Sequence, residues 1–498
     1  MSNDLTNKKC EAVQPVQQMT ESEMFAQRRA KLDKWRDFNV DPYGEAFDTD
    51  GKISDVRGKF KEGEEFHVKA AGRVTAMRDM GKSSFFDIRD YSGRIQVYIQ
   101  KNIVGDEAYS RFKLVDIGDF VGVSGPMFLT RTGELSVKAS SFKILSKALR
   151  FLPEKWHGLA DVEQRYRQRY LDLITNQESV DIFRKRMEII RHIRAFLSER
   201  DFLEVETPML QPIPGGAQAK PFETFYEALN SKMYMRIAPE LYLKRLLVGG
   251  FNKIFELNRN FRNEGMSRKH NPEFTMIEIY QAYGDCRTMM DLVENLISSA
   301  AQKVNGSTKI EKADGTVIDL TTPWKRLEYD DAVRGVAGAD WFLLGKDAKI
   351  AKALGMGLDV NQDMSDGEIT HEVYEKAVEP TLIQPTFVTN LPVSLVPLAK
   401  RSSQSPDKVD VFELEINGQE IAPGYSELND PGEQSLRFAQ QQGGNHDDSK
   451  TDKDFLAALE HGMPPAGGMG IGIDRLVMLL TRAESIRDVI LFPQLRPK

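Results

Sequence analysis

The chain of 498 residues contains only two cysteines, Cys10 and Cys286, which lie far apart in the sequence. So few thiols exclude a disulfide framework, and their separation excludes the paired spacing of a cysteine zinc site. This usage is typical of proteins in the reducing cytoplasm, which is the location we expect.

Long hydrophobic runs are also missing. No apolar stretch approaches the ~20 residues that a membrane-spanning helix needs. The polar first residues contain no signal-peptide core. A content of 41% hydrophobic and 28% charged residues is ordinary for soluble proteins. We therefore expect two to four soluble domains and no membrane partner.

Two common phosphate-binding signatures are absent. The glycine-rich run at 468–475 has Ile473 where the dinucleotide pattern needs its third glycine, and the Gly-Lys-Ser at 81–83 lacks the earlier glycine of a P-loop. The run does offer alternating glycines against which a flat ligand can lie. Arg475 at a helix start suits a terminal phosphate. The alternative is tight strand–helix packing with Asp474 as the cap.

The charge is uneven along the chain. The net charge is −7, yet the first 150 residues carry a small basic excess and the remainder is acidic. A basic amino-terminal third is compatible with phosphate contacts to a nucleic acid, although an ordinary soluble surface has the same pattern.

Composition and periodicity divide the chain into four parts. Residues 1–65 form an extension with an amphipathic helix at 21–38, 66–146 a small barrel of the OB type, 147–164 a linker and 165–498 a second domain. The barrel prediction rests on five strands separated by turn signals, at 66–74, 84–90, 94–99, 119–125 and 135–139.

The second domain mixes helices with a sheet, so the predicted fold class is α+β. The expected helices are 179–200, 239–249 and 286–304. The expected strands occupy 203–208, ended by Pro208, most of 232–283, and the neighbourhood of 410–428. A polar loop at 440–453 precedes a glycine-rich strand and a helix at 466–482. Residues 305–385 mix helix and loop and carry no recognisable chemistry.

The most informative motif is the segment 262–274. Arg262 and Glu264 share one face of a predicted strand because side chains alternate along it, and Phe274 opens the returning strand. An arginine for a phosphate, a carboxylate beside it and an aromatic ring for a base indicate a nucleotide site. A surface hairpin with a salt bridge is the alternative.

Acidic residues suggest two further sites. Glu413 and Glu420 flank a turn, and hard oxygen ligands beside phosphates suit magnesium. Glu240, Glu278 and Glu427 lie in partly apolar segments near Tyr280 and Tyr425. If these glutamates converge, the pocket favours a cationic small molecule. Taken singly, each carboxylate is more simply explained as a charged hairpin edge or a salt bridge.

Together these segments resemble the class II aminoacyl-tRNA synthetases, and within them the lysyl branch. The similar segments are 204–208, 261–264 and 470–475 for the three class motifs, and 215–217, 236–246, 259–274 and 425–430 for the lysyl branch. The resemblance extends from about residue 20 to the end, barrel included. It implies ATP-dependent activation of L-lysine and its transfer to the 3′ end of tRNA(Lys), with release of AMP and diphosphate. It also implies a homodimer with Pro208 at the interface.

The resemblance implies roles for individual residues. Arg262, Glu264 and Arg475 are the catalytic residues, with Arg262 on the α-phosphate and Arg475 on the γ-phosphate. The ATP-binding set is Arg262, Glu264, His270, Asn271, Phe274 and Arg475. The lysine-binding set is Gly216, Glu240, Glu278, Tyr280, Tyr425 and Glu427. Glu413 and Glu420 are the ligands of Mg²⁺, which accompanies ATP.

In the barrel, the resemblance implies that Phe85 stacks an anticodon base and that Gln96 and Glu134 read base edges, as aromatic platforms on OB sheets do. Phe86 is the alternative exposed ring. One departure is Pro423, where many relatives have asparagine. Proline lacks both the amide side chain and a backbone N–H, so we expect altered lysine affinity.

Three competing interpretations remain. Aspartyl- and asparaginyl-tRNA synthetases share the architecture, but an aspartate pocket needs a cation where this one is acidic. A lysine ligase that modifies elongation factor P resembles only the catalytic part, and the barrel argues against it. A non-catalytic tRNA-binding paralogue is disfavoured by the intact Arg262, Glu413, Glu420 and Arg475.

Overall fold

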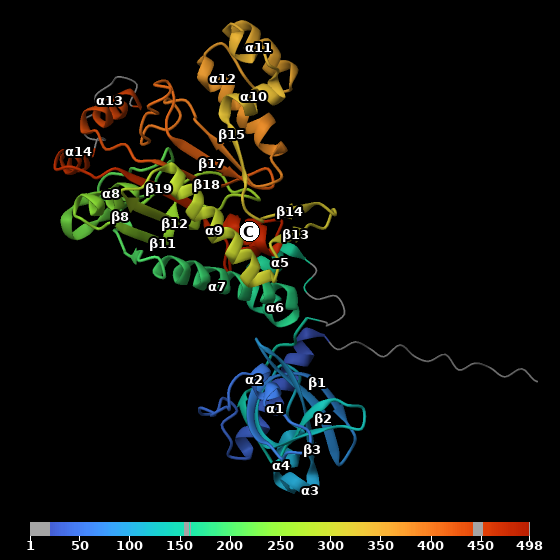
Figure 1. Cartoon of the computed structure of the whole chain (residues 1–498). Coiled ribbons are helices and arrows are strands. Elements are labelled where there is room, and N and C mark those ends of the chain that lie inside the picture. Colours follow the sequence, from blue (N-terminus) through green and yellow to red (C-terminus); the bar gives the residue numbers. More distant parts are fainter. Residues whose placement is uncertain (1–19, 154–158, 160, 442–451, 498) are drawn as a thin grey trace, which may run out of the picture. The chain divides into compact units, whose positions relative to one another are not determined.

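The computed structural model describes residues 20–153, 159, 161–441 and 452–497. The chain forms two compact units, coloured blue to cyan and green to red in Figure 1. The first unit ends at Asp161 and also takes in Tyr170–Asn176, whereas the second comprises Val162–Arg169 and the chain from Gln177 onward. Across the described ranges, no helix has the length and apolar character needed to span a membrane.

Six strands build the barrel of the first unit. They are β1 (His67–Asp79), β2 (Ser83–Asp90), β3 (Gly93–Gln100), β4 (Phe120–Leu129), β5 (Leu135–Lys138) and β6 (Ser141–Ser146). Their order is β1-β2-β3-β5-β4-β6, and β1 also pairs with β4, which closes the barrel. Apolar alternation places Ile95, Val97 and Ile99 of β3 in the core, all fully buried.

Five barrel strands were predicted, but the barrel has six. Strand β6 was missed because its six residues bury only Ile144 fully, so the segment has almost no hydrophobic alternation to detect. The strand forms because its backbone pairs with β4, a long-range partner that local sequence does not reveal.

Four short or medium helices accompany the barrel. They are α1 (Glu21–Asp37), α2 (Ile53–Gly58), α3 (Lys101–Val104) and α4 (Asp106–Phe112). The predicted helix is confirmed as α1, which begins with a capping box between Thr20 and Glu23 and buries only Arg28, Leu32 and Trp35, so its amphipathic character is weak. It buries Trp35 in the barrel core, and the Arg28 guanidinium donates to the carbonyl oxygens of Ile117 and Ala148.

A sheet of eight strands organises the second unit. In spatial order they are β15 (Lys325–Glu328), β16 (Thr386–Thr389), β17 (Val411–Glu415), β18 (Glu420–Ser426), β19 (Ala466–Gly472), β12 (Glu273–Ala282), β11 (Lys253–Phe261) and β7 (Leu203–Glu204). The six central strands are antiparallel, and each edge strand pairs in parallel with its neighbour. The predicted α+β class is confirmed.

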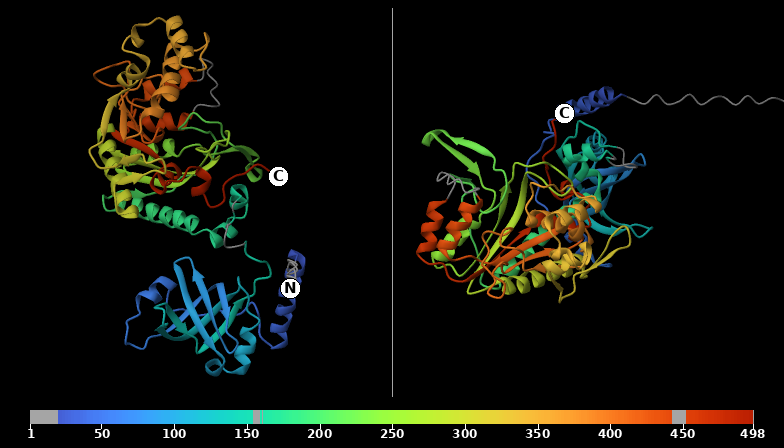
Figure 2. Two further views of the ribbon diagram at one scale, coloured as in Figure 1. Left: turned by 90° about the vertical axis from the view of Figure 1, so that its right-hand side faces the viewer. Right: turned by 90° about the horizontal axis from the view of Figure 1, so that it is seen from above.

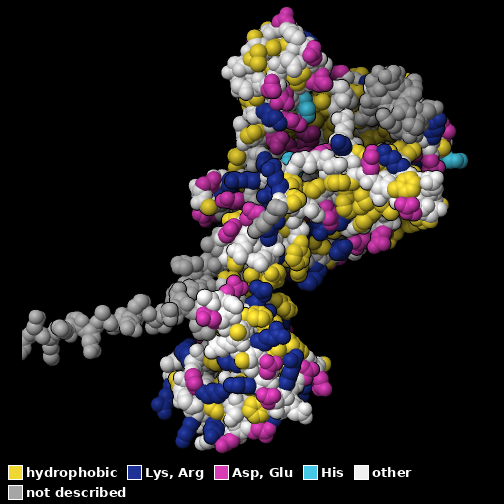
Figure 3. All heavy atoms as spheres, turned by 180° about the vertical axis from the view of Figure 1, so that it is seen from behind, with side chains coloured by type: hydrophobic (Ala, Val, Ile, Leu, Met, Phe, Trp, Pro, Cys, Tyr) yellow, Lys and Arg dark blue, Asp and Glu magenta, His cyan; other side chains and the backbone are white. Residues whose placement is uncertain are grey.

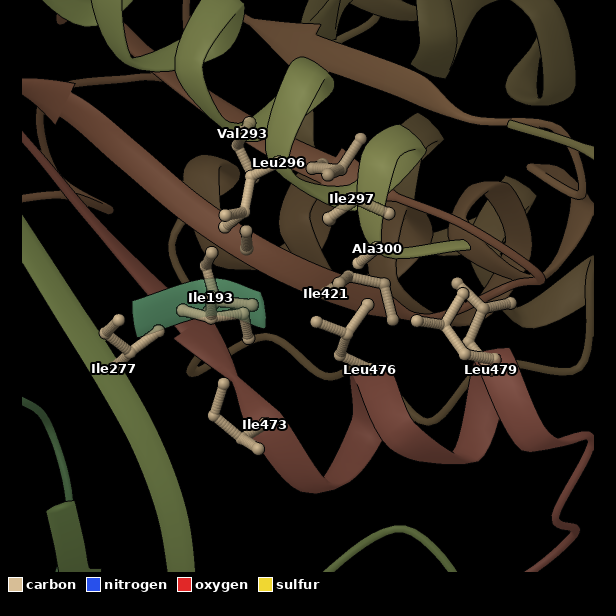
Figure 4. Packing of buried hydrophobic residues seen from close by; sticks show 14 of the residues in the cluster. Ile193, Ile277, Val293, Leu296, Ile297, Ala300, Ile421, Ile473, Leu476 and Leu479 are labelled. Atoms are coloured by element: carbon tan, nitrogen blue, oxygen red, sulfur yellow. The ribbon is translucent and has the colours of Figure 1, made fainter. Parts of the chain in front are cut away.

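Three helices pack against one another and the sheet to form the main core. They are α7 (Gln177–Ser198), α9 (Cys286–Asn305) and α15 (Ile473–Thr481). Ile193 of α7, Leu296 of α9, Leu476 of α15 and Ile277 of β12 belong to one buried cluster, part of which Figure 4 shows. Fully burying such a side chain contributes about 1.5–3 kcal/mol, so this core holds β12 and β19 rigidly in place.

Smaller elements surround this core. One small sheet has the strand order β8 (Leu210–Gln211), β10 (Ser231–Met235) and β9 (Glu223–Tyr226). A second small sheet pairs β13 (Lys309–Glu311) with β14 (Val317–Asp319). The remaining α-helices of this unit are α5 (Val162–Arg167), α8 (Glu240–Val248), α13 (Pro431–Gln441), α14 (Lys453–Glu460) and α16 (Ile486–Val489), whereas almost all of α6 (Arg169–Thr175) belongs to the first unit. Most of the predicted 440–453 loop lies outside the described residues.

A helical insertion interrupts the sheet between β15 and β16. It contains α10 (Tyr329–Ala337), α11 (Lys346–Gly355), α12 (Asp366–Val373) and a π-helical turn at Tyr374–Val378, with short 3-10 turns at Trp341–Leu343 and Glu379–Thr381. Figures 1 and 2 show these helices gathered beyond one edge of the sheet. Their apolar residues form a separate cluster around Trp341 and Tyr374.

Two local predictions near the site were wrong. The strand expected at 203–208 ends at Glu204, although the Val205 N–H still donates to the Phe255 carbonyl. Strand β11 ends at Phe261, so Arg262 and Glu264 do not share a strand face. The Glu264 N–H instead donates to the Arg262 carbonyl in a tight turn.

Candidate active site

One pocket brings together all six residues of the predicted ATP-binding set. Arg262, Glu264, His270, Asn271, Phe274 and Arg475 line it, together with Glu420 and Lys269. The residues come from the ends of β11 and β12, the loop between those strands and the start of α15. The antiparallel pairing of β11 with β12 and of β12 with β19 positions these segments side by side.

Arg262 faces this pocket from the end of β11. Its N–H donates to the Pro272 carbonyl at 2.9 Å, and its guanidinium carbon lies 5.2 Å from the centre of the Phe274 ring. Burial lowers the pKa of Arg262, with Glu264 and Glu420 opposing that shift. A guanidinium stays protonated in any such setting, so the pocket keeps a positive charge.

Arg475 is held by Glu420 and His270, and its Nη1 also lies 3.8 Å from the Glu420 carboxylate. Its Nη1 donates to the Glu420 carbonyl oxygen at 2.8 Å, and its Nη2 lies 3.1 Å from His270 Nε2. Burial and the nearby Arg475 lower the pKa of His270. A neutral imidazole accepts from Arg475 at Nε2 and donates from Nδ1 to Ser267 Oγ, 2.9 Å away.

The predicted magnesium ligands lie on adjacent strands, Glu413 on β17 and Glu420 at the start of β18. Burial and then the charge of Glu420 raise the pKa of Glu413 to about 8. Two carboxylates that repel each other beside an arginine-lined pocket fit a divalent cation bound with phosphates. In the described part of the chain, no set of three or more His, Cys, Asp or Glu side chains forms a complete metal site.

A second pocket holds most of the predicted lysine-binding set. Gly216, Glu240, Glu278, Tyr280 and Tyr425 line it. Gly216 has φ +87°, which favours glycine, and a Cβ there would crowd Ala238 and Glu240. Glu427 does not line this pocket.

Glu427 lies directly behind the pocket wall. A Cβ added at Gly468 would overlap both Glu427 Oε1 and the Tyr280 ring, so only glycine at 468 lets the carboxylate approach. Glu427 is fully buried.

The second pocket is strongly acidic. The Tyr280 hydroxyl donates to Glu278 Oε2 at 2.9 Å, and the Tyr425 hydroxyl donates to Glu240 Oε1 at 2.5 Å. Burial, followed by the charge of Glu240, raises the pKa of Glu278 to about 8. Buried carboxylates that outnumber the cations beside them attract a cationic ligand, because such a ligand relieves both desolvation and mutual repulsion.

The two pockets adjoin. Arg262, Met276 and Pro423 line both of them. A ligand with its cationic end among the glutamates would therefore present its other end to Arg262 and to a phosphate in the first pocket. This arrangement suits an attack on a nucleotide α-phosphate by the carboxylate of an amino acid.

Sequence reasoning missed several residues of the two pockets. Lys269 lines the first, and its Nζ donates to the Gly418 carbonyl at 3.2 Å. Lys244 is buried among the glutamates, and its i, i+4 spacing from Glu240 was the available signal. Asp474 does not cap α15; its carboxylate accepts from Arg186 and from the Thr275 N–H.

The predicted anticodon residues lie in the first unit. Phe85 on β2 is half-buried, 4.8 Å from the Tyr98 ring, whereas Phe86 belongs to the core. Gln96 on β3 is buried and accepts from the Ser136 hydroxyl. Glu134 in the turn before β5 lies 3.4 Å from Arg94. Of the two rings, Phe85 is partly exposed and Phe86 is buried, so the stacking role predicted for Phe85 stays a prediction that its exposure allows.

Comparison with known proteins agrees with both units. Residues 161–496 match the family described as tRNA synthetases class II (D, K and N), and residues 68–145 match the OB-fold nucleic acid binding domain. The chain therefore belongs to the class II tRNA synthetase family, and its first unit is an OB-fold.

Curated relatives narrow the similarity. The chain is 53% identical to the lysine–tRNA ligase of Pelotomaculum thermopropionicum, over 96% of each chain. It is 51% identical to that of Syntrophomonas wolfei and 52% identical to that of Carboxydothermus hydrogenoformans. The comparisons with the Syntrophomonas and Carboxydothermus proteins each cover 96% of this chain and at least 98% of the relative.

Proposed function

We propose that the chain is a lysine–tRNA ligase that activates L-lysine with ATP and transfers it to the 3′ end of tRNA(Lys). The observation that carries this proposal is the junction of the two pockets at Arg262, with arginines on one side and buried glutamates on the other. The excess of carboxylates on the acidic side favours the ammonium of lysine, repels the carboxylate of aspartate and gives the neutral amide of asparagine no matching charge.

The proposed first step joins lysine to AMP. A lysine carboxylate oxygen attacks the α-phosphorus, the bond to the bridging oxygen breaks, and diphosphate leaves. Arg262 meets the charge that develops on the α-phosphate, and Arg475 holds the γ-phosphate end. Phe274 stacks the adenine, with Glu264, His270 and Asn271 around the nucleotide.

The metal and the second step complete the proposed reaction. Glu413 and Glu420 would hold Mg²⁺, which neutralises phosphate charge when bound. The terminal tRNA hydroxyl then attacks the lysyl carbonyl carbon, and AMP leaves. Positioning and charge stabilisation suffice for both steps, so no covalent enzyme intermediate is invoked.

Lysine recognition is assigned to the second pocket. Glu278 and Tyr280 meet the side-chain ammonium, with Tyr425 and Glu427 beside them, and Glu240 and the Gly216 backbone meet the α-amino group. The burial of all three carboxylates supports this assignment, because their charges need a cationic partner.

Recognition of tRNA is assigned to the barrel of 66–146, and catalysis to the domain of 165–498. Phe85 stacks an anticodon base, while Gln96 and Glu134 read base edges. Figure 3 shows many Lys and Arg side chains on the smaller unit, which suits phosphate contacts. We place the protein in the cytoplasm, where tRNA is charged.

A homodimer is part of the proposal. Large hydrophobic side chains are exposed on α7, β7, β8 and the β9 hairpin, namely Met187, Leu203, Leu210, Phe225, Tyr226 and Leu229. Figure 3 shows hydrophobic side chains gathered on a face of the larger unit. Pro208 is exposed in the same segment as Leu203 and Leu210. An apolar surface of this kind marks a protein interface.

ATP–pyrophosphate exchange, run separately with each standard amino acid, tests the proposed function. We expect exchange with lysine alone. Exchange with aspartate or asparagine would mean that the pocket is misassigned. No exchange, even with tRNA added, would favour a non-catalytic tRNA-binding role.

A further inference from the structure

Lys244 is a buried cation whose partners are the carboxylates of the lysine pocket. Its side chain is completely buried on α8, and its Nζ lies 2.8 Å from Glu240 Oε1 and 2.5 Å from Glu427 Oε2. The Leu398 carbonyl lies 3.4 Å away, and the Tyr425 ring centre is 5.5 Å away. Burial alone would lower the pKa of Lys244, but the two carboxylates outweigh it and raise that pKa.

The third glutamate of the site has no such partner. Glu278 accepts from the Tyr280 hydroxyl, and Lys244 forms ion pairs only with Glu240 and Glu427 among the described residues. Three carboxylates and one ammonium leave two negative charges unmatched. A lysine molecule brings two ammonium groups, and its carboxylate faces Arg262, so the charges match.

We propose that Lys244 is a positioning residue for lysine recognition, a built-in ammonium that orients Glu240 and Glu427 and offsets part of their buried charge. This inference rests on the proposed function. Lys244 acts through the two glutamates and does not touch the substrate. The groups that face it or its partners are Glu240 on α8, Tyr425 and Glu427 from the β18 side, Glu278 and Tyr280 on β12, and Arg236.

Removing the Lys244 ammonium should make the affinity for lysine depend more steeply on pH than it does in wild type. In a Lys244→Met variant, the buried pair of Glu240 and Glu427 should together hold up to about one more proton at neutral pH than in wild type, because buried carboxylates without a cation are costly to ionise. Lysine would then have to displace an additional proton. Raising the pH removes that proton beforehand and restores part of the affinity.

The experiment compares Lys244→Met with wild type by ATP–pyrophosphate exchange between pH 6.5 and 9. At pH 7 we expect the lysine KM to rise about a hundredfold, as loss of one partner of a buried ion pair implies. The ATP KM should change by no more than about threefold, because that pocket is intact. The KM ratio of variant to wild type should fall by up to about tenfold per pH unit.

Lys349 supplies a matched control. It is also a buried helical lysine, paired with Asp366 at 2.7 Å and close to the rings of Trp341 and Phe342, but it belongs to the helical insertion. Lys349→Met should lower the melting temperature and leave the lysine KM within about twofold at every pH. A Lys244→Met effect that matches this control would overturn the inference.

A double variant keeps the test decisive if Lys244→Met folds poorly. Lys244→Met with Glu427→Gln removes one charge of each sign, so the interior stays balanced. Adding Lys244→Met to Glu427→Gln should cost much less lysine affinity than adding it to wild type. Equal costs, or a KM ratio independent of pH, would overturn the inference. Wild-type exchange that lysine does not drive would overturn the proposed function as well.

Discussion

The two pockets use opposite charge in opposite surroundings. The arginines of the nucleotide pocket are only loosely paired: Arg475 donates to the Glu420 carbonyl and lies 3.8 Å from the Glu420 carboxylate, so its guanidinium can still meet a phosphate. The glutamates of the lysine pocket are buried, and burial raises the pKa of Glu278 to about 8. The first pocket therefore presents charge before its ligand arrives, whereas the second acquires its full charge with the ligand.

The two pockets meet at Arg262, where we expect the attack on the α-phosphate to take place. Arg262→Ala should reduce the rate of lysine-dependent pyrophosphate exchange by about a thousandfold, the loss typical of a group that stabilises developing charge. The effect should fall mainly on kcat, measured at saturating lysine and ATP. Arg262→Lys should recover only part of it, since an ammonium cannot replace a bidentate guanidinium. A loss confined to the lysine KM would place Arg262 in binding alone.

The lysine pocket should respond through affinity. Glu278→Gln should raise the lysine KM about a hundredfold, because the side-chain ammonium of the substrate loses the one carboxylate of the pocket that does not pair with Lys244. The ATP KM should stay within about threefold, measured in the same exchange assay. An equal rise in both constants would mean that the two pockets are not separable.

Proton release should distinguish the pockets further. At pH 7, Glu278 with a pKa of about 8 is mostly protonated in the empty pocket, and a bound ammonium lowers that pKa. Lysine binding should thus release up to about one proton, and affinity should increase as the pH rises toward 8 and then level off. Titration calorimetry in buffers of different ionisation enthalpy measures the proton count. Nucleotide binding should show no such release from Glu278, and Glu278→Gln should remove the share of the release that comes from Glu278 when lysine binds.

The smallest expected effect concerns Pro423 at the junction. Pro423 lines both pockets and offers no amide to a ligand. Pro423→Asn should change the lysine KM by about threefold, in keeping with one gained hydrogen bond. An unchanged KM in the exchange assay would show that the departure from asparagine is without consequence for lysine.

Local sequence patterns were enough to predict much of the fold. The period of 3.6 residues in α7 and α9, and the apolar alternation in β3, arise from burial of one face, which residue order records directly. Strand β6 and the early end of β7 were missed because they depend on partners distant in the chain. The turn that takes Arg262 out of β11 likewise depends on its bond to Pro272.

The site residues show the same division. Motif resemblance nominated the glutamates and arginines, but their spatial relations came only from the structure. The i, i+4 spacing indicated that Lys244 could reach Glu240, but nothing in the sequence indicated that Glu427 lies behind Gly468 or that Lys244 also pairs with it. A buried lysine in a helical pattern is indistinguishable from a solvated one until the surrounding strands are placed.

The most direct test of the account is a crystal structure of the protein with L-lysine and a non-hydrolysable ATP analogue. The account predicts the lysine side-chain ammonium within hydrogen-bond distance of Glu278, its carboxylate between Arg262 and the α-phosphate, and the adenine against Phe274. Lysine bound elsewhere, or with its carboxylate turned away from Arg262, would contradict it.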